Sequence, residues 1–208
     1  MSSYIMHMCI SDIVKRRLNL TEKYVYGSVL PDVLKGITKD RKKTHYLFSQ
    51  KVNDEVRTLP NIDKAIQELN FEDKEIKLGY ISHLIEDYIW FNKYVPAYAK
   101  ILSDEEMMYF KDGSKHSSDE FRDDIYRDYL NSGAYVIDKC EVDMEVLKEK
   151  MYKDITDKKH INLIEENMVY ITNKGVSDNV FMTKESIDEY IKETVEEVQK
   201  VMIDLLGE

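Results

Sequence analysis

Apolar residues recur three and four residues apart along much of the chain, and this spacing is typical of amphipathic helices. It predicts a first helix over residues 6–18 and a long central helix over residues 71–94. A further stripe predicts a C-terminal helix over residues 184–206, which Gly207 ends. Shorter helices are expected over residues 61–69, 104–110, 117–139 and 144–155.

An apolar stretch after the first helix is interrupted by Pro31. Because proline lacks an N–H and restricts the residue before it, Asp32 is expected at a bend or at the start of a fresh helical turn. The polar residues 35–43 predict a loop, and His45 follows this loop directly.

Helix-breaking residues are rare elsewhere. The 208 residues include only 7 Gly and 3 Pro, which favours long helices. Gly133 predicts a break or kink in the helix over residues 117–139, and residues 168–182 match no single pattern. We therefore predict an all-α fold in which residues 1–208 form a single multi-helix domain.

The formal net charge of −10 limits the possible partners. It argues against a nucleic-acid scaffold, which needs a basic surface to neutralise phosphates. It leaves a phosphoester substrate possible, because a bound metal can reverse the local field.

The compartment is inferred from the cysteines and from the start of the chain. Cys9 and Cys140 form no disulfide framework and are expected to be reduced thiols in or near the core. No basic segment followed by an apolar run opens the chain, and no stretch has the length of a membrane span. We expect a cytoplasmic protein without a transmembrane segment.

The clearest candidate for chemistry is a pair on the central helix. His83 and Asp87 are four residues apart, so both side chains lie on one helix face. That face is otherwise apolar, and a buried carboxylate needs a partner. The partner can be a metal ion, or the pair can be a His–Asp hydrogen bond or salt bridge without metal.

Three further residues gain meaning only in combination with this pair. His7 lies on the inner face of the first helix, Asp32 follows a proline, and His45 follows a loop. Each alone has an ordinary structural interpretation, as a core histidine or a turn residue. Together they supply the nitrogen and carboxylate ligands that zinc prefers. His160 lies in a charged run and is expected on the solvated surface.

The order of these residues resembles the zinc-dependent phospholipase C family, and most closely its short bacterial members without signal peptides. The family is related in fold to single-strand-specific zinc nucleases. The resemblance covers about the first 95 residues, and the segments that carry it are His7, G-S-V-L-P-D ending at Asp32, T-H-Y containing His45, and G-Y-I-S-H-L-I-E-D from Gly79 to Asp87.

The resemblance implies an all-α fold with metals in a cleft between helices. It implies that Asp32, His45, His83 and Asp87 bind one zinc ion. His7 would bind a second ion, with Asp87 as the bridging ligand. Asp32 would also be the general base.

The chain departs from the secreted members of the family at two places. It opens with Met1–Ser3 in place of a processed tryptophan, and Lys93 stands where those members have a further histidine. We therefore expect one or two zinc ions. His116 and Glu120 are four residues apart and are either a remnant of a further metal site or an exposed pair at a helix start.

The resulting hypothesis is a metal-dependent phosphoester hydrolase of the phospholipase C type, in which Asp32 orients or deprotonates a metal-activated water. The substrate would be a small phosphoester or a phospholipid. The alternative is a non-catalytic helical protein that keeps part of the site for metal or ligand binding. The helical metallophosphohydrolases with an adjacent His-Asp pair are disfavoured, because the chain has no His-Asp dipeptide. The C-terminal amphipathic helix serves core packing or a contact between identical chains.

Overall fold

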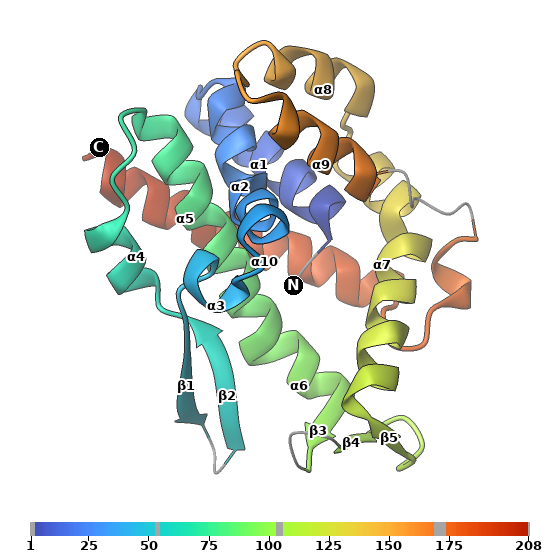
Figure 1. Cartoon of the computed structure of the whole chain (residues 1–208). Helices are drawn as coiled ribbons and strands as arrows, with labels where there is room; N and C mark the ends of the chain where they lie inside the picture. The colour runs from blue at the N-terminus through green and yellow to red at the C-terminus, as the bar shows by residue number, and fades with distance from the viewer. Residues whose placement is uncertain (1–2, 53–54, 103–105, 169–173, 208) are drawn as a thin grey trace.

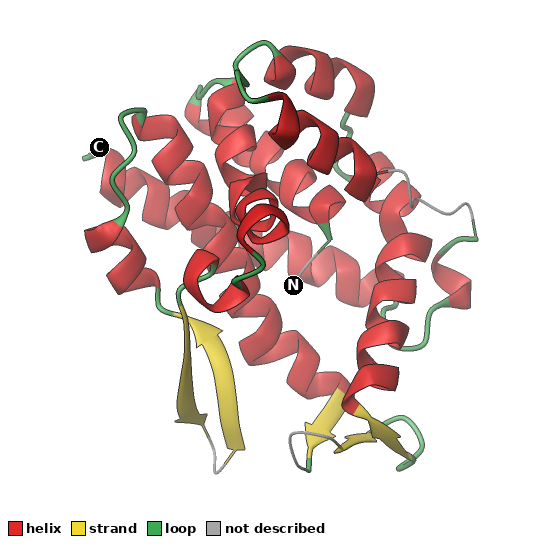
Figure 2. Ribbon diagram, viewed as in Figure 1, coloured by secondary structure: helices red, strands yellow, loops and turns green. Residues whose placement is uncertain are grey.

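The computed structural model describes residues 3–52, 55–102, 106–168 and 174–207, and these are mainly helical (Figures 1 and 2). The helices are α1 (Tyr4–Leu18), α2 (Glu22–Thr38), α3 (Arg41–Thr44), α4 (Ile62–Glu68), α5 (Lys74–Ile89), α6 (Val95–Tyr98), α7 (Ser118–Lys139), α8 (Met144–Tyr152), α9 (Lys158–Met168) and α10 (Lys184–Leu206). A π-helical turn, Trp90–Tyr94, joins α5 to α6, and a short 3-10 turn spans Val176–Asp178. The all-α fold class is confirmed.

Two small antiparallel sheets lie at the same end of the molecule (Figure 2). One pairs β1 (Leu47–Val52) with β2 (Glu55–Pro60) as a hairpin. The other has the order β3–β4–β5 and consists of Ala99–Ile101, Glu106–Tyr109 and Lys115–Ser117. Neither sheet was predicted from the sequence.

The predicted helix boundaries agree with the observed capping residues at several ends. The Asn61 side chain accepts a hydrogen bond from the Lys64 N–H at the start of α4. Ser117 and Glu120 form a capping box at the start of α7. Gly207 adopts a left-handed conformation with φ 81° and ends α10.

The helices α2 and α5 approach each other closely through two glycines. A Cβ atom on Gly79 would lie 2.0 Å from the Tyr24 carbonyl oxygen, and one on Gly27 would lie 2.3 Å from the Ile76 carbonyl oxygen. Both distances are shorter than van der Waals contact, so only glycine permits this approach. The close approach brings the backbone of α2 next to the face of α5 that carries His83 and Asp87.

The expected bend at Pro31 is wrong, because α2 continues through Pro31 to Thr38. Proline inside a helix costs about 3 kcal/mol. Residues 24–33 of α2 are all buried, and the apolar contacts of this segment outweigh that cost. The expected loop over residues 35–43 is therefore only partly present. Only residues 39 and 40 separate α2 from α3, and Lys39, with φ 58°, ends α2.

Three other expectations differ from the structure. The expected helix over residues 104–110 is instead strand β4 over residues 106–109, while residues 104 and 105 lie outside the described residues. The helix α7 runs unbroken past Gly133, because one glycine costs only about 1 kcal/mol in a helix of this length. The central helix begins at Lys74 after the Asp73 cap, and its last turn is π-helical.

No helix in the described part of the chain is both long enough and apolar enough to cross a membrane.

Candidate metal centre

Five side chains that sequence analysis selected converge in the interior. His7 comes from α1, Asp32 from α2, and His83 and Asp87 from α5, while His45 directly follows α3. Each of these residues is buried, with at most 4% of its surface exposed. The fold therefore brings together residues from four separate parts of the chain.

The carboxylate of Asp87 lies among three imidazoles. Its Oδ1 is 3.8 Å from His7 Nε2, and its Oδ2 is 3.9 Å from both His45 Nε2 and His83 Nε2. These separations exceed hydrogen-bond lengths. Donor atoms around one tetrahedral zinc lie about 3.4 Å apart, because each bond is about 2.1 Å long. The distances between Asp87 and the three imidazoles therefore fit side chains that coordinate a common metal ion better than side chains that hydrogen-bond to each other.

The potential ligand atoms form two overlapping groups. One contains His7, His83 and Asp87, and the other contains Asp32, His45 and His83, with the atoms of each group within 4.8 Å of one another. The carboxylate oxygen Asp32 Oδ1 lies 3.3 Å from His45 Nε2. The arrangement has room for either one or two ions. His83 belongs to both groups, and Asp87 of the first group lies 3.9 Å from His45 of the second.

Hydrogen bonds orient two of the imidazoles. His83 Nδ1 lies 2.7 Å from the Ser28 carbonyl oxygen. Because a carbonyl oxygen can only accept a hydrogen bond, Nδ1 carries the proton, and the lone pair of Nε2 is left to bind a metal. His45 Nδ1 is 2.9 Å from the Thr44 hydroxyl. In both residues Nδ1 forms a hydrogen bond and Nε2 faces Asp87, which is the usual arrangement of metal-binding histidines.

His7 is oriented by a buried carboxyl group. Glu86 Oε2 lies 2.8 Å from His7 Nδ1, and Glu86 Oε1 accepts a hydrogen bond of 3.0 Å from the Ser82 hydroxyl. Glu86 is fully buried, and burial, followed by the nearby Asp87, raises the pKa of Glu86 well above its usual value. This His–Glu pair is the arrangement that holds a ligating histidine in place at metal sites.

Several polar atoms of the centre have no hydrogen-bond partner within the described residues. They are Asp32 Oδ2, His45 Nε2 and His83 Nε2, and all three are buried. Leaving such atoms unpaired in the interior costs free energy, so native proteins rarely do so. A divalent cation would satisfy all three, and their nitrogen and oxygen chemistry suits zinc.

The charge states of these groups also suit a metal. Burial lowers the pKa of His83 to about 4, although Asp87 and Asp32 oppose the effect. Burial and the neighbouring His83 lower the pKa of His7, whose ring stacks on that of His83 with centroids 3.8 Å apart. Burial raises the pKa of Asp32, but His45, His83 and Lys35 together lower it by more. The net pKa is therefore below its usual value, and the carboxyl group stays ionised. His7 and His83 are thus neutral and Asp32 is anionic, which are the metal-binding forms.

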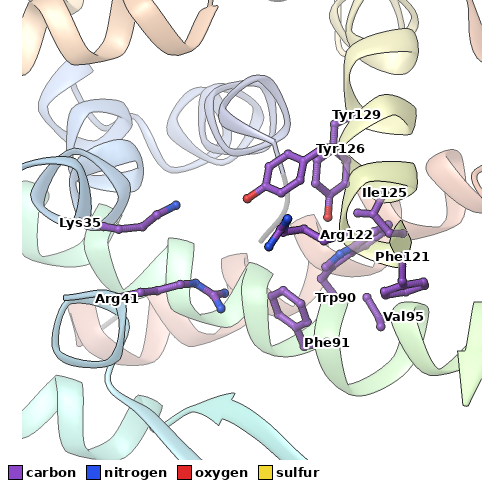
Figure 3. A pocket seen from close by; sticks show the side chains of 10 residues that line it. All are labelled: Lys35, Arg41, Trp90, Phe91, Val95, Phe121, Arg122, Ile125, Tyr126 and Tyr129. Carbon is purple, nitrogen blue, oxygen red and sulfur yellow. The ribbon is translucent and has the colours of Figure 1, made fainter. Parts of the chain in front are cut away.

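A pocket of about 300 Å³ adjoins the centre (Figure 3). Two of its lining residues contact the carboxylates: Lys35 Nζ lies 3.3 Å from Asp32 Oδ1, and the Arg41 guanidinium lies 3.6 Å from Asp87 Oδ2. The centre therefore stands next to a space large enough for a small ligand. The other lining residues are Trp90, Phe91, Val95, Phe121, Arg122, Ile125, Tyr126 and Tyr129.

A family model described as zinc dependent phospholipase C matches residues 6–201, nearly the whole chain. The chain belongs to the zinc-dependent phospholipase C family. The comparison with curated proteins and the comparison with solved structures gave no match. The family match confirms the resemblance inferred from the first 95 residues and extends it into α10.

The second His and Glu pair has a different role in this member of the phospholipase C family. Glu120 caps α7, where its carboxylate accepts a 2.8 Å hydrogen bond from the Ser117 N–H. The His116 ring stacks on Tyr109 with centroids 3.8 Å apart, and its Nδ1 is 4.0 Å from Glu120 Oε2. Neither residue belongs to the two groups of potential ligands found in the described structure. The pair is accounted for by capping and stacking.

The expectation that His160 is solvated surface is wrong. Helix α9, which was not predicted, places His160 against α2, where its Nδ1 is 2.6 Å from the Tyr26 hydroxyl. Only 15% of its side chain is exposed. The predicted burial of Cys9 and Cys140 is confirmed, and neither forms a disulfide.

Sequence reasoning missed Glu86, Lys35 and Arg41. Glu86 is adjacent to Asp87 in the G-Y-I-S-H-L-I-E-D segment, and an acidic residue inside so apolar a helix is a signal of a buried role. Lys35 and Arg41 fell in the presumed loop, where a positive charge carries no special meaning. Their proximity to the centre depends on how α2 and α3 fold.

Proposed function

We propose that this member of the zinc-dependent phospholipase C family is a zinc-dependent phosphoester hydrolase that uses a metal-activated water. The observation that carries the proposal is the set of buried, unpartnered atoms on Asp32, His45 and His83 beside an open pocket. A purely structural zinc site has four protein ligands and no access, whereas a catalytic site keeps a position for water or substrate.

The proposed ligand assignment is the one that the family resemblance implies, and the two clusters of potential ligand atoms support it. Asp32, His45, His83 and Asp87 would hold one ion, and His7 would hold a second ion together with Asp87. When bound, zinc lowers the pKa of a coordinated water toward neutrality and polarises a phosphoryl oxygen.

The residues of the chain have distinct tasks in this proposal. Asp32 would orient the attacking water or accept its proton, since Oδ2 is the oxygen of Asp32 that has no hydrogen bond within the described residues. Lys35 and Arg41 border the pocket next to Asp32 and Asp87, where they would stabilise the negative charge that develops on the phosphoryl oxygens. Glu86 would keep the His7 ring in place through the bond to Nδ1.

The test combines elemental analysis with hydrolysis assays. Purified protein should contain zinc, and it should hydrolyse a phosphodiester or phosphomonoester in a reaction that a chelator abolishes and added zinc restores. His83→Ala and Asp87→Ala should both lose metal. His116→Ala is the matched control, because His116 lies outside the ligand groups, and it should keep both metal and activity.

Two results would contradict the proposal in different ways. Unchanged metal content in both His83→Ala and Asp87→Ala would show that the ligand assignment is wrong. Zinc binding without hydrolysis of any phosphoester would instead favour a metal-binding protein without catalytic activity.

A further inference from the structure

The pocket beside the metal centre carries an unusual concentration of positive charge. Its lining includes Lys35 from α2, Arg41 from α3 and Arg122 from α7 (Figure 3). None of the described residues that line it is acidic, although the chain has a formal net charge of −10. The pocket lining thus offers basic side chains alone to a ligand, while the carboxylates that pair with them lie outside the lining.

Two of these cations stand at the end of the pocket that meets the centre. Lys35 and Arg41 lie 3.3 Å and 3.6 Å from carboxylate oxygens of Asp32 and Asp87. They are placed to meet the reacting phosphoryl group. Arg41 Nε is also buried and has no hydrogen-bond partner among the described residues.

Arg122 lies across the pocket from Lys35 and Arg41 (Figure 3). Its guanidinium pairs with Asp119 at 2.8 Å and Asp123 at 3.4 Å, and all three side chains are more than half exposed. Exposed ion pairs of this kind contribute at most about 1 kcal/mol. A bound anion can therefore replace these partners at little cost, so Arg122 is available to a part of the ligand remote from the reacting phosphate.

The aromatic side chains of the pocket admit a second interpretation, because aromatic faces also bind quaternary ammonium groups such as choline. Here the face of Phe91 is already covered by Arg41, with the guanidinium carbon 5.3 Å from the ring centroid. The lining of this pocket of about 300 Å³ offers a ligand cation no carboxylate, whereas it offers an anion three basic side chains. The charges thus favour an anionic ligand over a cationic one.

We infer that the pocket selects phosphoesters that carry a second anionic group in addition to the reacting phosphate. Lys35 and Arg41 would bind the phosphate, and Arg122 would bind the second anion. The inference rests on the proposed hydrolase function for the site, and it specifies the class of substrate that the site accepts.

Binding can be tested separately from catalysis, because Trp90 lines the pocket and is the one tryptophan of the sequence. Its fluorescence in the zinc-loaded protein would report binding of three phosphomonoesters. Phosphoglycerate carries a second anion, glycerol phosphate carries none, and phosphocholine carries a cation. We expect phosphoglycerate to bind about tenfold more tightly than glycerol phosphate, and phosphocholine to bind most weakly.

The Arg122→Gln variant tests whether Arg122 binds the second anion. It should lose the preference for phosphoglycerate while binding glycerol phosphate with little change. Arg127→Gln is the matched control: Arg127 is on the same helix, is similarly exposed and pairs with Asp124, but does not line the pocket. Thermal unfolding of both variants would show that each is folded. Equal or tighter binding of phosphocholine by the wild type would overturn the inference, as would an equal loss for all three ligands in Arg122→Gln.

Hydrolysis rates can distinguish a phospholipid substrate with a second anionic group from a soluble phosphoester with the same group. Short-chain phosphatidylinositol monophosphate and its deacylated form present the same headgroup with and without acyl chains. Faster hydrolysis of either one than of the corresponding choline ester supports the inference, and the better of the two identifies the source. Metal-dependent hydrolysis that favours the choline ester would contradict this inference alone, whereas no hydrolysis of any ester would contradict the proposed function.

Discussion

At the residue scale, Glu86 is the most informative addition to the predicted ligands. It is fully buried, and its two oxygens contact His7 Nδ1 and the Ser82 hydroxyl. A carboxyl group in this position fixes the ring of the histidine. Glu86 would therefore influence a bound metal without touching it.

Replacing Glu86 with glutamine should weaken metal binding without unfolding the protein. The amide keeps the shape and the contact with Ser82 but replaces the carboxyl oxygen that contacts His7 Nδ1. Loss of such a partner reduces metal affinity by about 10- to 100-fold. Competition with a chromogenic chelator would measure the zinc affinity, and Glu166→Gln on the exposed face of α9 provides the control. An affinity equal to that of the wild type would show that Glu86 has no influence on the metal.

The buried His83 should make the stability of the metal-free protein depend on pH. Its pKa is about 4 in the folded protein and about 6.5 in an unfolded chain. Between these values the unfolded state binds a proton that the folded state excludes, so the stability contributed by neutral His83 is complete above pH 6.5 and falls as the pH drops toward 4. The loss is about 1.4 kcal/mol per pH unit, or roughly 3 kcal/mol in total.

Denaturant unfolding in chelator at several pH values would test this, with His83→Asn as the reference. The difference in unfolding free energy between wild type and variant should shrink as the pH falls from 6.5 to 4. A difference that is constant across this range would show that His83 titrates normally.

The pair on the central helix was predictable from local spacing, whereas His7, Asp32 and His45 were selected only in combination with it and through the family resemblance. His83 and Asp87 share a helix face whatever else the chain does. The positioning groups were not predictable in the same way. The Ser28 carbonyl that orients His83 lies on another helix, 55 residues away in the chain, and its role appears only after α2 and α5 have packed.

At the scale of elements, the contact between α2 and α5 determines the geometry of the centre. The two glycines allow the helices to approach, and the hydrogen bond from His83 to the Ser28 carbonyl spans the same contact. The separation of these helices and the orientation of His83 are therefore coupled.

Gly79→Ala should both destabilise the protein and weaken zinc binding. The added methyl would lie 2.0 Å from the Tyr24 carbonyl oxygen, which is backbone and cannot turn away. The helices would have to separate, at a cost of about 3 kcal/mol or more. Thermal unfolding and zinc titration would measure the two effects.

Gly36→Ala is the matched control on α2, because its added methyl would meet only the flexible Leu163 side chain at 3.3 Å. It should be neutral, or stabilising by up to about 1 kcal/mol through helix propensity. Equal behaviour of the two variants would contradict the role given to the close approach.

Helices were easier to predict than the other elements. Long amphipathic stripes and capping residues gave α1, α5, α7 and α10 with boundaries close to those observed. The hairpin of β1 and β2 was missed because its short strands are set by pairing and by the contact of Arg57 with the Asn92 carbonyl, not by a local pattern. The continuation of α2 through Pro31 was not predicted, because the burial of its apolar side chains outweighs the tendency of proline to end a helix.

At the scale of the whole molecule, metal binding should contribute to folding stability. Without an ion, the buried atoms of Asp32, His45 and His83 have no partner within the described structure. A ligand present at a thousand times its dissociation constant stabilises the folded state by about 4 kcal/mol. Treatment with chelator should therefore lower the melting temperature by several degrees, and zinc should restore it while magnesium does not. An unchanged melting temperature in protein shown to have lost its metal would contradict this expectation.

The position of Asp87, with one oxygen near His7 and the other near His45, has a consequence for cooperativity. The charges of Asp32 and Asp87 balance a single divalent ion, so a second ion would add two positive charges that these ligands do not balance. Such an excess attracts a counter-anion, and by thermodynamic linkage the anion must then favour the second ion to the same degree. Occupancy by two ions should therefore rise with phosphate concentration, and the site would be completed only as the substrate arrives.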